Sequence, residues 1–383
     1  MFRIQYFIIF LLAMTFSGME ARQLPADGPL TVDEALQRLG ERLMEGKQGS
    51  IVALDPRDGA VRCMVSSSFL ADTLNRAIGR VYNPGSTFKV AQTLALASEG
   101  IINRDSKFTC QEGFWRAKIH IGCHPHRSPQ ALIGALAHSC NSYFCKAFMA
   151  MLDNRTRYKT RAEALDTWDG YMKSLGFGAP LGIDMPGEAG GMMPDAAYCN
   201  KAFAGRWNAQ TIMWVGMGQG EAMVTPLQLC NLAAIIANRG FFYTPHIHQS
   251  TLQQPLDSVY LRRREVKFSP QAMTAAIEGM RGAMTFGTCA HIRTPGYQMC
   301  GKTGTTENEG DDHSIFIGFA PKDNPQIAIC VYVENAGFGA DVAAPIAALM
   351  VEQALKGKLS ETSESHAGQW ENYFVIPYMG DGE

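Results

Sequence analysis

Ser86 and Lys89 are the first residues in the chain whose types and spacing could do chemistry, in the stretch NPGSTFKVAQTLALAS. If Ser86 opens a helix, Lys89 lies one turn later on the same face. A lysine amine whose pKa is lowered by burial can take the proton of the hydroxyl, which makes the serine a nucleophile. On its own, however, the stretch better fits a serine that only caps a helix, because serine is a common N-cap.

Two further polar groups lie far along the chain. Ser139 and Asn141 fall in a short break between helical segments, where they could present a hydroxyl and an amide to one cleft. Lys302 lies in GKTGTT, a strand-like run in which a glycine is typical of close approach by another backbone. Each group alone is as well explained by an ordinary helix cap or by a turn at the edge of a strand.

The order of the predicted elements indicates how these groups could meet. A helix that starts at Thr31 and a β-hairpin come first, a long helical middle follows, and three strand-like runs and a helix come last. Because strands and helices do not alternate strictly, a doubly wound fold is disfavoured. We predict one antiparallel sheet built by both ends of the chain, with a helical lobe between them. The expected elements are helix 31–46, hairpin 49–67, helices 90–101, 129–152, 225–240 and 269–284, strands 296–307, 312–321 and 326–335, and helix 341–355.

Taken together, the three polar groups are far more specific than any one of them. Ser-x-x-Lys, Ser-x-Asn and Lys-Thr-Gly, in this order, are the triple signature of penicillin-binding proteins and serine β-lactamases. Over residues 31–357 the sequence resembles the transpeptidase domain of class B penicillin-binding proteins, most of all the penicillin-binding protein 2 group that acts in elongation. The resemblance implies an α/β fold of the penicillin-binding-protein/serine β-lactamase type, in which helices flank an antiparallel five-stranded sheet and an all-helical lobe is attached.

The resemblance also implies a role for each catalytic residue. Ser86 would be the nucleophile that accepts the acyl group, and Lys89 would activate it. Ser139 would shuttle a proton between Ser86 or the leaving amine and its surroundings. Asn141 would hold the donor peptide by its amide. Lys302 would help to set the electrostatics around Ser139.

A substrate and a partner follow from the same resemblance. Thr303, Gly304 and Thr305 would line the strand that binds the donor peptide or a β-lactam carboxylate, and the N–H groups of Ser86 and Thr305 would form the oxyanion hole. Ser86 would attack the D-Ala-D-Ala bond of a peptidoglycan stem peptide, and an amine from a neighbouring strand would turn the acyl-enzyme into a cross-link. β-Lactams would trap the enzyme. A membrane glycosyltransferase is the implied partner.

The stretch CQEGFWRAKIHIGCHPH draws attention because the chain has ten cysteines. Cys110, Cys123, His124 and His126 have types and spacings that could hold zinc, and some penicillin-binding protein 2 relatives hold a zinc ion in this region. An exported protein also permits a Cys110–Cys123 disulfide. Zinc, a disulfide and free side chains remain three open alternatives, and we otherwise expect no cofactor.

Residues 1–21 are typical of an export signal. Arg3 is followed by an apolar stretch shorter than the roughly 20 residues of a membrane-spanning helix, which favours a cleaved signal peptide over an anchor. We therefore expect an exported, periplasmic protein, either soluble or anchored to the inner membrane by this segment. Residues 22–30 would form a linker, 31–357 the transpeptidase domain and 358–383 a loosely ordered polar tail.

The chain departs from the class B pattern in one respect. Class B members usually carry a large N-terminal pedestal module, which we expect to be absent here, and this leaves a catalytically idle β-lactam sensor or scaffold as an alternative function. A serine β-lactamase is another, since Glu188 lies at about the distance along the chain where class A enzymes place a deacylating glutamate. Because DMPGE resembles a loop of the transpeptidase family, we interpret Glu188 as structural. A formal net charge of −2 and the lack of a basic block argue against a nucleic-acid partner.

Overall fold

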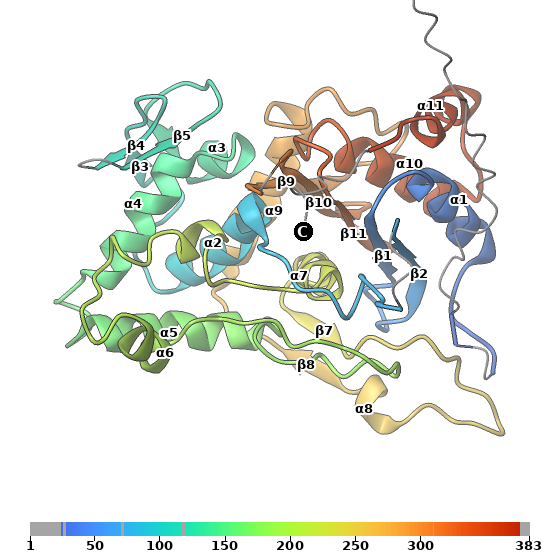
Figure 1. The fold of residues 1–383 in the computed structure, drawn as a ribbon, viewed down its shortest axis with the longest axis horizontal. Helices are drawn as coiled ribbons and strands as arrows, with labels where there is room; N and C mark the ends of the chain where they lie inside the picture. The colour runs from blue at the N-terminus through green and yellow to red at the C-terminus, as the bar shows by residue number, and fades with distance from the viewer. Residues whose placement is uncertain (1–23, 26–27, 70–72, 117–118, 309, 376–383) are drawn as a thin grey trace, which may run out of the picture.

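The computed structural model combines a β-sheet covered by helices with a second, mostly helical region (Figure 1). It describes residues 24–25, 28–69, 73–116, 119–308 and 310–375. The helices are α1 (Glu34–Met44), α2 (Lys89–Ser98), α3 (Leu132–Ala137), α4 (Asn141–Leu152), α5 (Arg161–Ser174), α6 (Ala196–Ala202), α7 (Pro226–Ala237), α8 (Ser258–Leu261), α9 (Pro270–Thr285), α10 (Ala343–Lys356) and α11 (Glu361–Glu371), with 3-10 turns η1 (Gly85–Phe88) and η2 (Val215–Met217). The strands are β1 (Gly49–Leu54), β2 (Val61–Ser67), β3 (Lys107–Phe108), β4 (Gly113–Arg116), β5 (Ile119–Gly122), β6 (Gln130–Ala131), β7 (Phe241–Tyr243), β8 (Arg263–Glu265), β9 (Cys300–Thr306), β10 (His313–Ala320) and β11 (Ile327–Val333).

Five antiparallel strands form the main sheet in the order β2-β1-β11-β10-β9. β1 pairs with β11, so that Gly49 lies opposite Val333 and Leu54 lies opposite Ala328. The predicted antiparallel sheet from both chain ends is thereby confirmed. β9 is an edge strand, and within the described residues its outer side has no strand partner.

Helices cover both faces of this sheet, with α1 and α10 on one face and α7 on the other (Figure 1). This explains why β10 and β11 read as nearly continuous apolar runs rather than alternating ones. α7 starts with a capping box between Thr225 and Gln228 and carries Pro226 at its first turn, as its sequence predicts. Cys230 of α7 and Cys330 of β11 are fully buried core residues.

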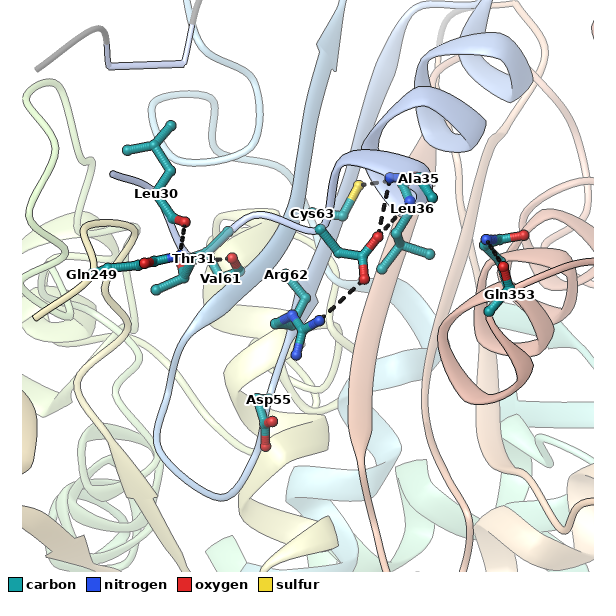
Figure 2. A network of polar contacts seen from close by, with 12 residues as sticks. Leu30, Thr31, Ala35, Leu36, Asp55, Val61, Arg62, Cys63, Gln249 and Gln353 are labelled. Carbon is teal, nitrogen blue, oxygen red and sulfur yellow. Dashed lines mark hydrogen bonds and ion pairs between the residues drawn. The ribbon is translucent and has the colours of Figure 1, made fainter. Parts of the chain in front are cut away.

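Helix α1 begins at Glu34, three residues later than predicted. Asp33 accepts the first free N–H groups of the helix at 3.0 and 3.1 Å and pairs with Arg62 at 3.2 Å (Figure 2). The Thr31 hydroxyl instead donates to the carbonyl oxygen of Val61 at 2.8 Å, so Thr31 contacts the start of β2 and does not cap the helix. Asp33 takes the cap position because its carboxylate accepts both N–H groups.

The second region is not all-helical, contrary to the expectation. Besides α2 to α6 it contains short two-stranded ladders, β3 with β6 and β4 with β5, and another ladder, β7 with β8, follows α7. The β4–β5 hairpin lies between the predicted helices 90–101 and 129–152, where no strand is among the expected elements. Its strands are too short to show an alternating apolar pattern, and they are defined by an antiparallel ladder that runs from Gly113 opposite Gly122 to Arg116 opposite Ile119.

The C-terminal segment also differs from the expected loose tail, because it contains α11. Ser360 caps this helix, and the buried Glu352 accepts a hydrogen bond from the Ser363 hydroxyl at 2.5 Å. Ala367 packs into the core beneath the sheet. None of the helices within the described residues has the length and apolar character needed to cross a membrane. The predicted export segment 1–21 lies outside the described residues.

Candidate active site

Ser86 lies in η1, the 3-10 turn that runs directly into α2. Neither helical segment has a side-chain cap, so the alternative in which Ser86 only caps a helix does not hold. Its hydroxyl instead contacts Lys89 Nζ at 2.5 Å. In a 3-10 helix, side chains three residues apart eclipse one another, and this geometry brings the amine of Lys89 against the Ser86 oxygen.

Lys89 is the hub of a polar cluster. Its Nζ also donates to Asn141 Oδ1 at 2.6 Å and to Ser139 Oγ at 3.3 Å. The side chain is fully buried, and burial lowers its pKa to about 8. The structure therefore brings together Ser86, Lys89, Ser139 and Asn141, with an amine that loses its proton much more easily than an exposed lysine does.

The short non-helical segment between α3 and α4 positions the Ser-x-Asn motif, and the sequence predicts an interruption of the helix there. Ser139 takes a left-handed conformation with φ of 58°, which ends α3 and turns the chain toward the cluster. Asn141 is the first residue of α4, and its Nδ2 donates to the carbonyl oxygen of Gly122 at 2.6 Å. The side-chain amide of Asn141 is thus held at both ends, by Lys89 and by the end of β5.

The third motif lies on the edge strand β9. Lys302 is fully buried, and its Nζ donates to the carbonyl oxygen of Thr303 at 2.9 Å. Burial, reinforced by the positive charge of Lys89 nearby, holds the pKa of Lys302 well below its usual value. The hydrogen bond of Lys302 thus goes to its own strand, and its effect on the electrostatics around Ser139 stays a prediction.

Gly304 allows β9 to approach η1. A Cβ atom at this position would lie 2.9 Å from Thr87 Cγ2 and 3.1 Å from the Pro84 carbonyl oxygen. A larger residue would have to push the strand away from the turn that carries Ser86. The glycine of the Lys-Thr-Gly motif is therefore explained by this close backbone approach.

A cavity of about 350 Å³ opens above the cluster. Of the residues predicted to be catalytic or to bind substrate, Ser86, Ser139, Asn141, Thr303 and Thr305 line it, and the zinc candidates Cys123 and His124 line it too. The sequence did not single out three further lining residues, Trp214, Gln219 and Phe338. Gln219 lies within the stretch MGQGEAM, so the Gly-Gln-Gly pattern is the signal that could have found it.

The predicted zinc candidates separate into two groups. Sulfur and ring nitrogen atoms of Cys110, Cys123, His126 and Cys140 all lie within 4.8 Å of one another. His124 is not part of this cluster, because it lines the catalytic cavity and contacts Phe338 edge-on, with ring centroids 5.6 Å apart. Cys140 takes its place. No disulfide joins Cys110 to Cys123, and both cysteines are free.

The cluster has the electronic character of a metal site. A hydrogen bond from Cys140 and the backbone N–H of Ser142 lower the pKa of the Cys123 thiol. His126 Nδ1 lies 2.8 Å from the Arg127 carbonyl oxygen, so the ring proton is on Nδ1. His126 Nε2 is buried and has no hydrogen-bond partner among the residues that the structure describes. A buried lone pair beside thiol sulfurs is what zinc requires.

Glu188 has a structural role, as interpreted from the sequence. Its carboxylate accepts the backbone N–H groups of Leu181, Gly182 and Ile183 at 2.7, 2.8 and 3.1 Å. It is not among the residues that line the catalytic cavity. Glu188 therefore closes its own loop and is not placed to activate a water molecule at Ser86.

We expect Glu188→Gln to reduce stability without changing the chemistry of deacylation. A glutamine replaces one acceptor oxygen by a donor, so at least one backbone N–H loses its partner, at a cost of about 1–3 kcal/mol. Urea unfolding should show this loss, while the lifetime of a penicilloyl adduct, followed by intact mass, should stay unchanged. A much longer adduct lifetime in the variant would show that Glu188 assists hydrolysis.

Comparison with known proteins decides the family. Residues 49–352 match the family model described as the penicillin binding protein transpeptidase domain. The chain belongs to this family. It is 29% identical to the peptidoglycan D,D-transpeptidase MrdA of Acinetobacter baumannii, over 82% of this chain and 52% of the relative, and 27% identical to MrdA of Haemophilus influenzae, over 88% and 57%. The chain thus spans about half the length of these curated relatives.

Solved structures of penicillin-binding proteins share the fold. The structure of Pseudomonas aeruginosa PBP2 in complex with WCK 5153 matches with a TM-score of 0.75 and 29% identity, over 87% of this chain and 76% of that one. A peptidoglycan synthase complex, described as coordinating polymerization and crosslinking, matches with a TM-score of 0.75 and 26% identity, over 87% and 63%. The predicted fold class, apart from its all-helical lobe, and the predicted likeness to penicillin-binding protein 2 are both confirmed.

Proposed function

We propose that this penicillin-binding protein is a peptidoglycan D,D-transpeptidase that forms an acyl-enzyme on Ser86. The observation that carries the proposal is the 2.5 Å contact between Lys89 Nζ and Ser86 Oγ, at the floor of a cavity that Ser139 and Asn141 also line. The names of the relatives, peptidoglycan D,D-transpeptidases from several bacteria, support it.

Acylation begins with the buried lysine. With a pKa of about 8, roughly a tenth of Lys89 is neutral at pH 7, and this form accepts the Ser86 proton. Ser86 Oγ attacks the carbonyl carbon between the two terminal D-alanines. The negative charge that develops on the carbonyl oxygen would be held by the N–H groups of Ser86 and Thr305, a contribution that typically amounts to about 2.7–4 kcal/mol for each donor.

The next step breaks the C–N bond and uses the proton that Lys89 now holds. Ser139 Oγ lies 3.3 Å from Lys89 Nζ, so Ser139 can donate its own proton to the departing D-Ala amine and regain one from Lys89. An ester on Ser86 remains. An amine of a second stem peptide then attacks the ester, its proton returns by the same route to Ser86 Oγ, and an amide cross-link forms.

The open side of β9 offers a place for the donor peptide. An extended peptide can add to an edge strand through backbone hydrogen bonds, and Thr303 and Thr305 both line the cavity on this strand. A peptide bound there would present its carbonyl carbon to Ser86. A β-lactam would bind in the same way and leave a stable ester, because its ring-opened part stays attached.

The decisive experiment combines adduct mapping with product release. Benzylpenicillin should add one penicilloyl group to the protein, on the peptide that contains Ser86, and a D-Ala-D-Ala stem peptide with an acceptor amine should yield free D-Ala and a cross-linked product. Ser86→Ala is the negative control for both. Rapid hydrolysis of penicillin would indicate a β-lactamase, and an adduct without D-Ala release would indicate a sensor or scaffold.

We also propose that Cys110, Cys123, His126 and Cys140 hold a zinc ion. Three sulfurs and one buried, unpartnered imidazole nitrogen within 4.8 Å form a donor set that suits tetrahedral zinc. Bound zinc would act structurally, as a cross-link between the β4–β5 hairpin and the start of α4.

Purified without chelators, the protein should therefore contain about one zinc per chain. Elemental mass spectrometry should show this, and His126→Ala should reduce the content and lower the melting temperature, since metal binding to the folded state stabilises it. His124→Ala is the matched control, because His124 lies outside the cluster. Equal zinc content in wild type and His126→Ala would contradict the assignment.

The cellular setting is likewise a proposal. The sequence of residues 1–21 supports export to the periplasm. The matched synthase complex, whose description joins polymerization and crosslinking, supports a glycosyltransferase as partner. Fractionation of cells and co-purification with a membrane glycosyltransferase would test the two parts separately, and recovery of the protein in the cytosol would contradict the first.

A further inference from the structure

Asn141 forms hydrogen bonds with two adjacent residues outside its own helix, Gly122 at the end of β5 and Cys123 directly after it. The carbonyl oxygen of Gly122 accepts a hydrogen bond from Asn141 Nδ2 at 2.6 Å. Cys123 Sγ accepts the backbone N–H of Asn141 at 3.1 Å and that of Ser142 at 3.5 Å. Both the side chain and the backbone of Asn141 are thus tied to one short segment of the β4–β5 hairpin.

The two contacts of Cys123 Sγ do the work of a helix cap at the start of α4. The first N–H groups of an α-helix have no partner within the helix, and the residue before it usually supplies one. At α4 the preceding residue is Cys140, and its sulfur accepts the N–H of Tyr143 at 3.4 Å. The two N–H groups before Tyr143, those of Asn141 and Ser142, rely on the sulfur of Cys123, which lies 18 residues away from Asn141 in the chain.

The orientation of the Asn141 amide has a direct chemical consequence. Its Oδ1 accepts from Lys89 Nζ at 2.6 Å, on the side opposite to the Gly122 contact. If the amide turned over, its NH₂ group would face the lysine amine and both contacts would be lost. The hydrogen bond from Asn141 to Gly122 therefore also fixes the Asn141 oxygen that accepts from Lys89 and so orients Lys89 toward Ser86.

We propose that Cys123 is a positioning residue for the acylation of Ser86, which it promotes by fixing the backbone at Asn141. This inference rests on the proposed function of Ser86. It assigns Cys123 a task beyond membership of the cysteine cluster, because Cys123 contacts the start of α4 directly, whereas Cys110 Sγ lies beside the carbonyl oxygen of Gly113.

Cys110 provides the matched control, since it belongs to the same cluster but, among the described residues, forms no hydrogen bond with Asn141. Cys110→Ala and Cys123→Ala each remove one sulfur from the cluster. Any effect that acts through metal binding or general stability should appear in both variants. An effect through Asn141 should appear only for Cys123.

A double-mutant cycle with Asn141→Ala separates the two effects. We expect Cys123→Ala to slow penicillin acylation of the otherwise wild-type protein about tenfold or more, since small misplacements of catalytic groups are costly. In the Asn141→Ala background the same change should cost less than about twofold. Cys110→Ala should have the same effect in both backgrounds. Equal behaviour of the two cysteine variants would overturn the proposal.

A second measurement does not depend on the reaction. Amide hydrogen exchange at the start of α4 should rise in Cys123→Ala and not in Cys110→Ala, because only the former loses the cap. If exchange rises while acylation stays unchanged, Cys123 is a cap without a positioning role and the proposal fails. Cys123→Ser, which keeps a shorter acceptor, replaces Cys123→Ala if that variant does not fold. Absence of a wild-type adduct would instead refute the proposed function.

Discussion

Lys89→Met should slow the acylation of Ser86 by penicillin about 1,000-fold. The amine lies 2.5 Å from the Ser86 oxygen, and general-base catalysis typically contributes about 100- to 10,000-fold. Methionine keeps a long unbranched side chain in the fully buried position, so the change removes the base and leaves little empty space. Stopped-flow measurement of adduct formation would give the rate constants.

The pH dependence of acylation provides a stricter test of the same residue. The reactive form of Lys89 is the neutral amine, and its pKa is lowered to about 8. The wild-type rate should therefore rise about tenfold per pH unit below this value and level off above it. The rate for Lys89→Met should lack this rise. A wild-type rate that falls between pH 6 and 8 would show that the protonated amine is the active form.

Gly304→Val should also slow the acylation of Ser86 by penicillin at least about 100-fold, although residue 304 touches no reacting atom. A Cβ at this position already meets Thr87 Cγ2 at 2.9 Å and the Pro84 carbonyl oxygen at 3.1 Å, and valine adds two more carbons. β9 must then move away from η1, and the Thr305 N–H leaves the place where the developing oxyanion needs it.

Valine suits a strand, so the sheet itself should persist. Acylation and melting temperature should be measured together, with Gly170→Ala as the control, because a Cβ at Gly170 meets nothing within 4 Å. We expect a modest loss of melting temperature for Gly304→Val and unchanged acylation for the control. Near-normal acylation by a folded Gly304→Val protein would show that the strand and the turn need not be so close.

The catalytic cluster could be predicted because each motif is local. Ser86 and Lys89 are one turn apart, and Ser139 and Asn141 flank a visible break between helices, so their types and spacing carry the information. The alternative that fits the isolated stretch, a serine that only caps a helix, does not hold in the structure, since a local rule cannot tell that the Ser86 hydroxyl contacts Lys89.

The cysteine cluster shows what local patterns miss. His124 and His126 are equivalent by spacing, yet only His126 turns toward Cys110 and Cys123, while His124 faces the catalytic cavity. Cys140 was overlooked because it lies inside the Ser-x-Asn motif and joins the other cysteines only through the folding of the β4–β5 hairpin. Side-chain direction over such distances is set by tertiary packing and not by the sequence nearby.

The pairing of β1 with β11 determines the order in which parts of the chain can fold. Gly49 meets Val333 in the sheet, so the central strands cannot associate until most of the polypeptide has been synthesised. Contacts between such distant segments make folding slow, because a very long loop must close before they form. Ser86 on η1 and strand β9 contact each other across a similarly long separation, so the candidate site is completed only when the C-terminal strands join the sheet. A chain with this topology therefore cannot assemble the site from its N-terminal half alone.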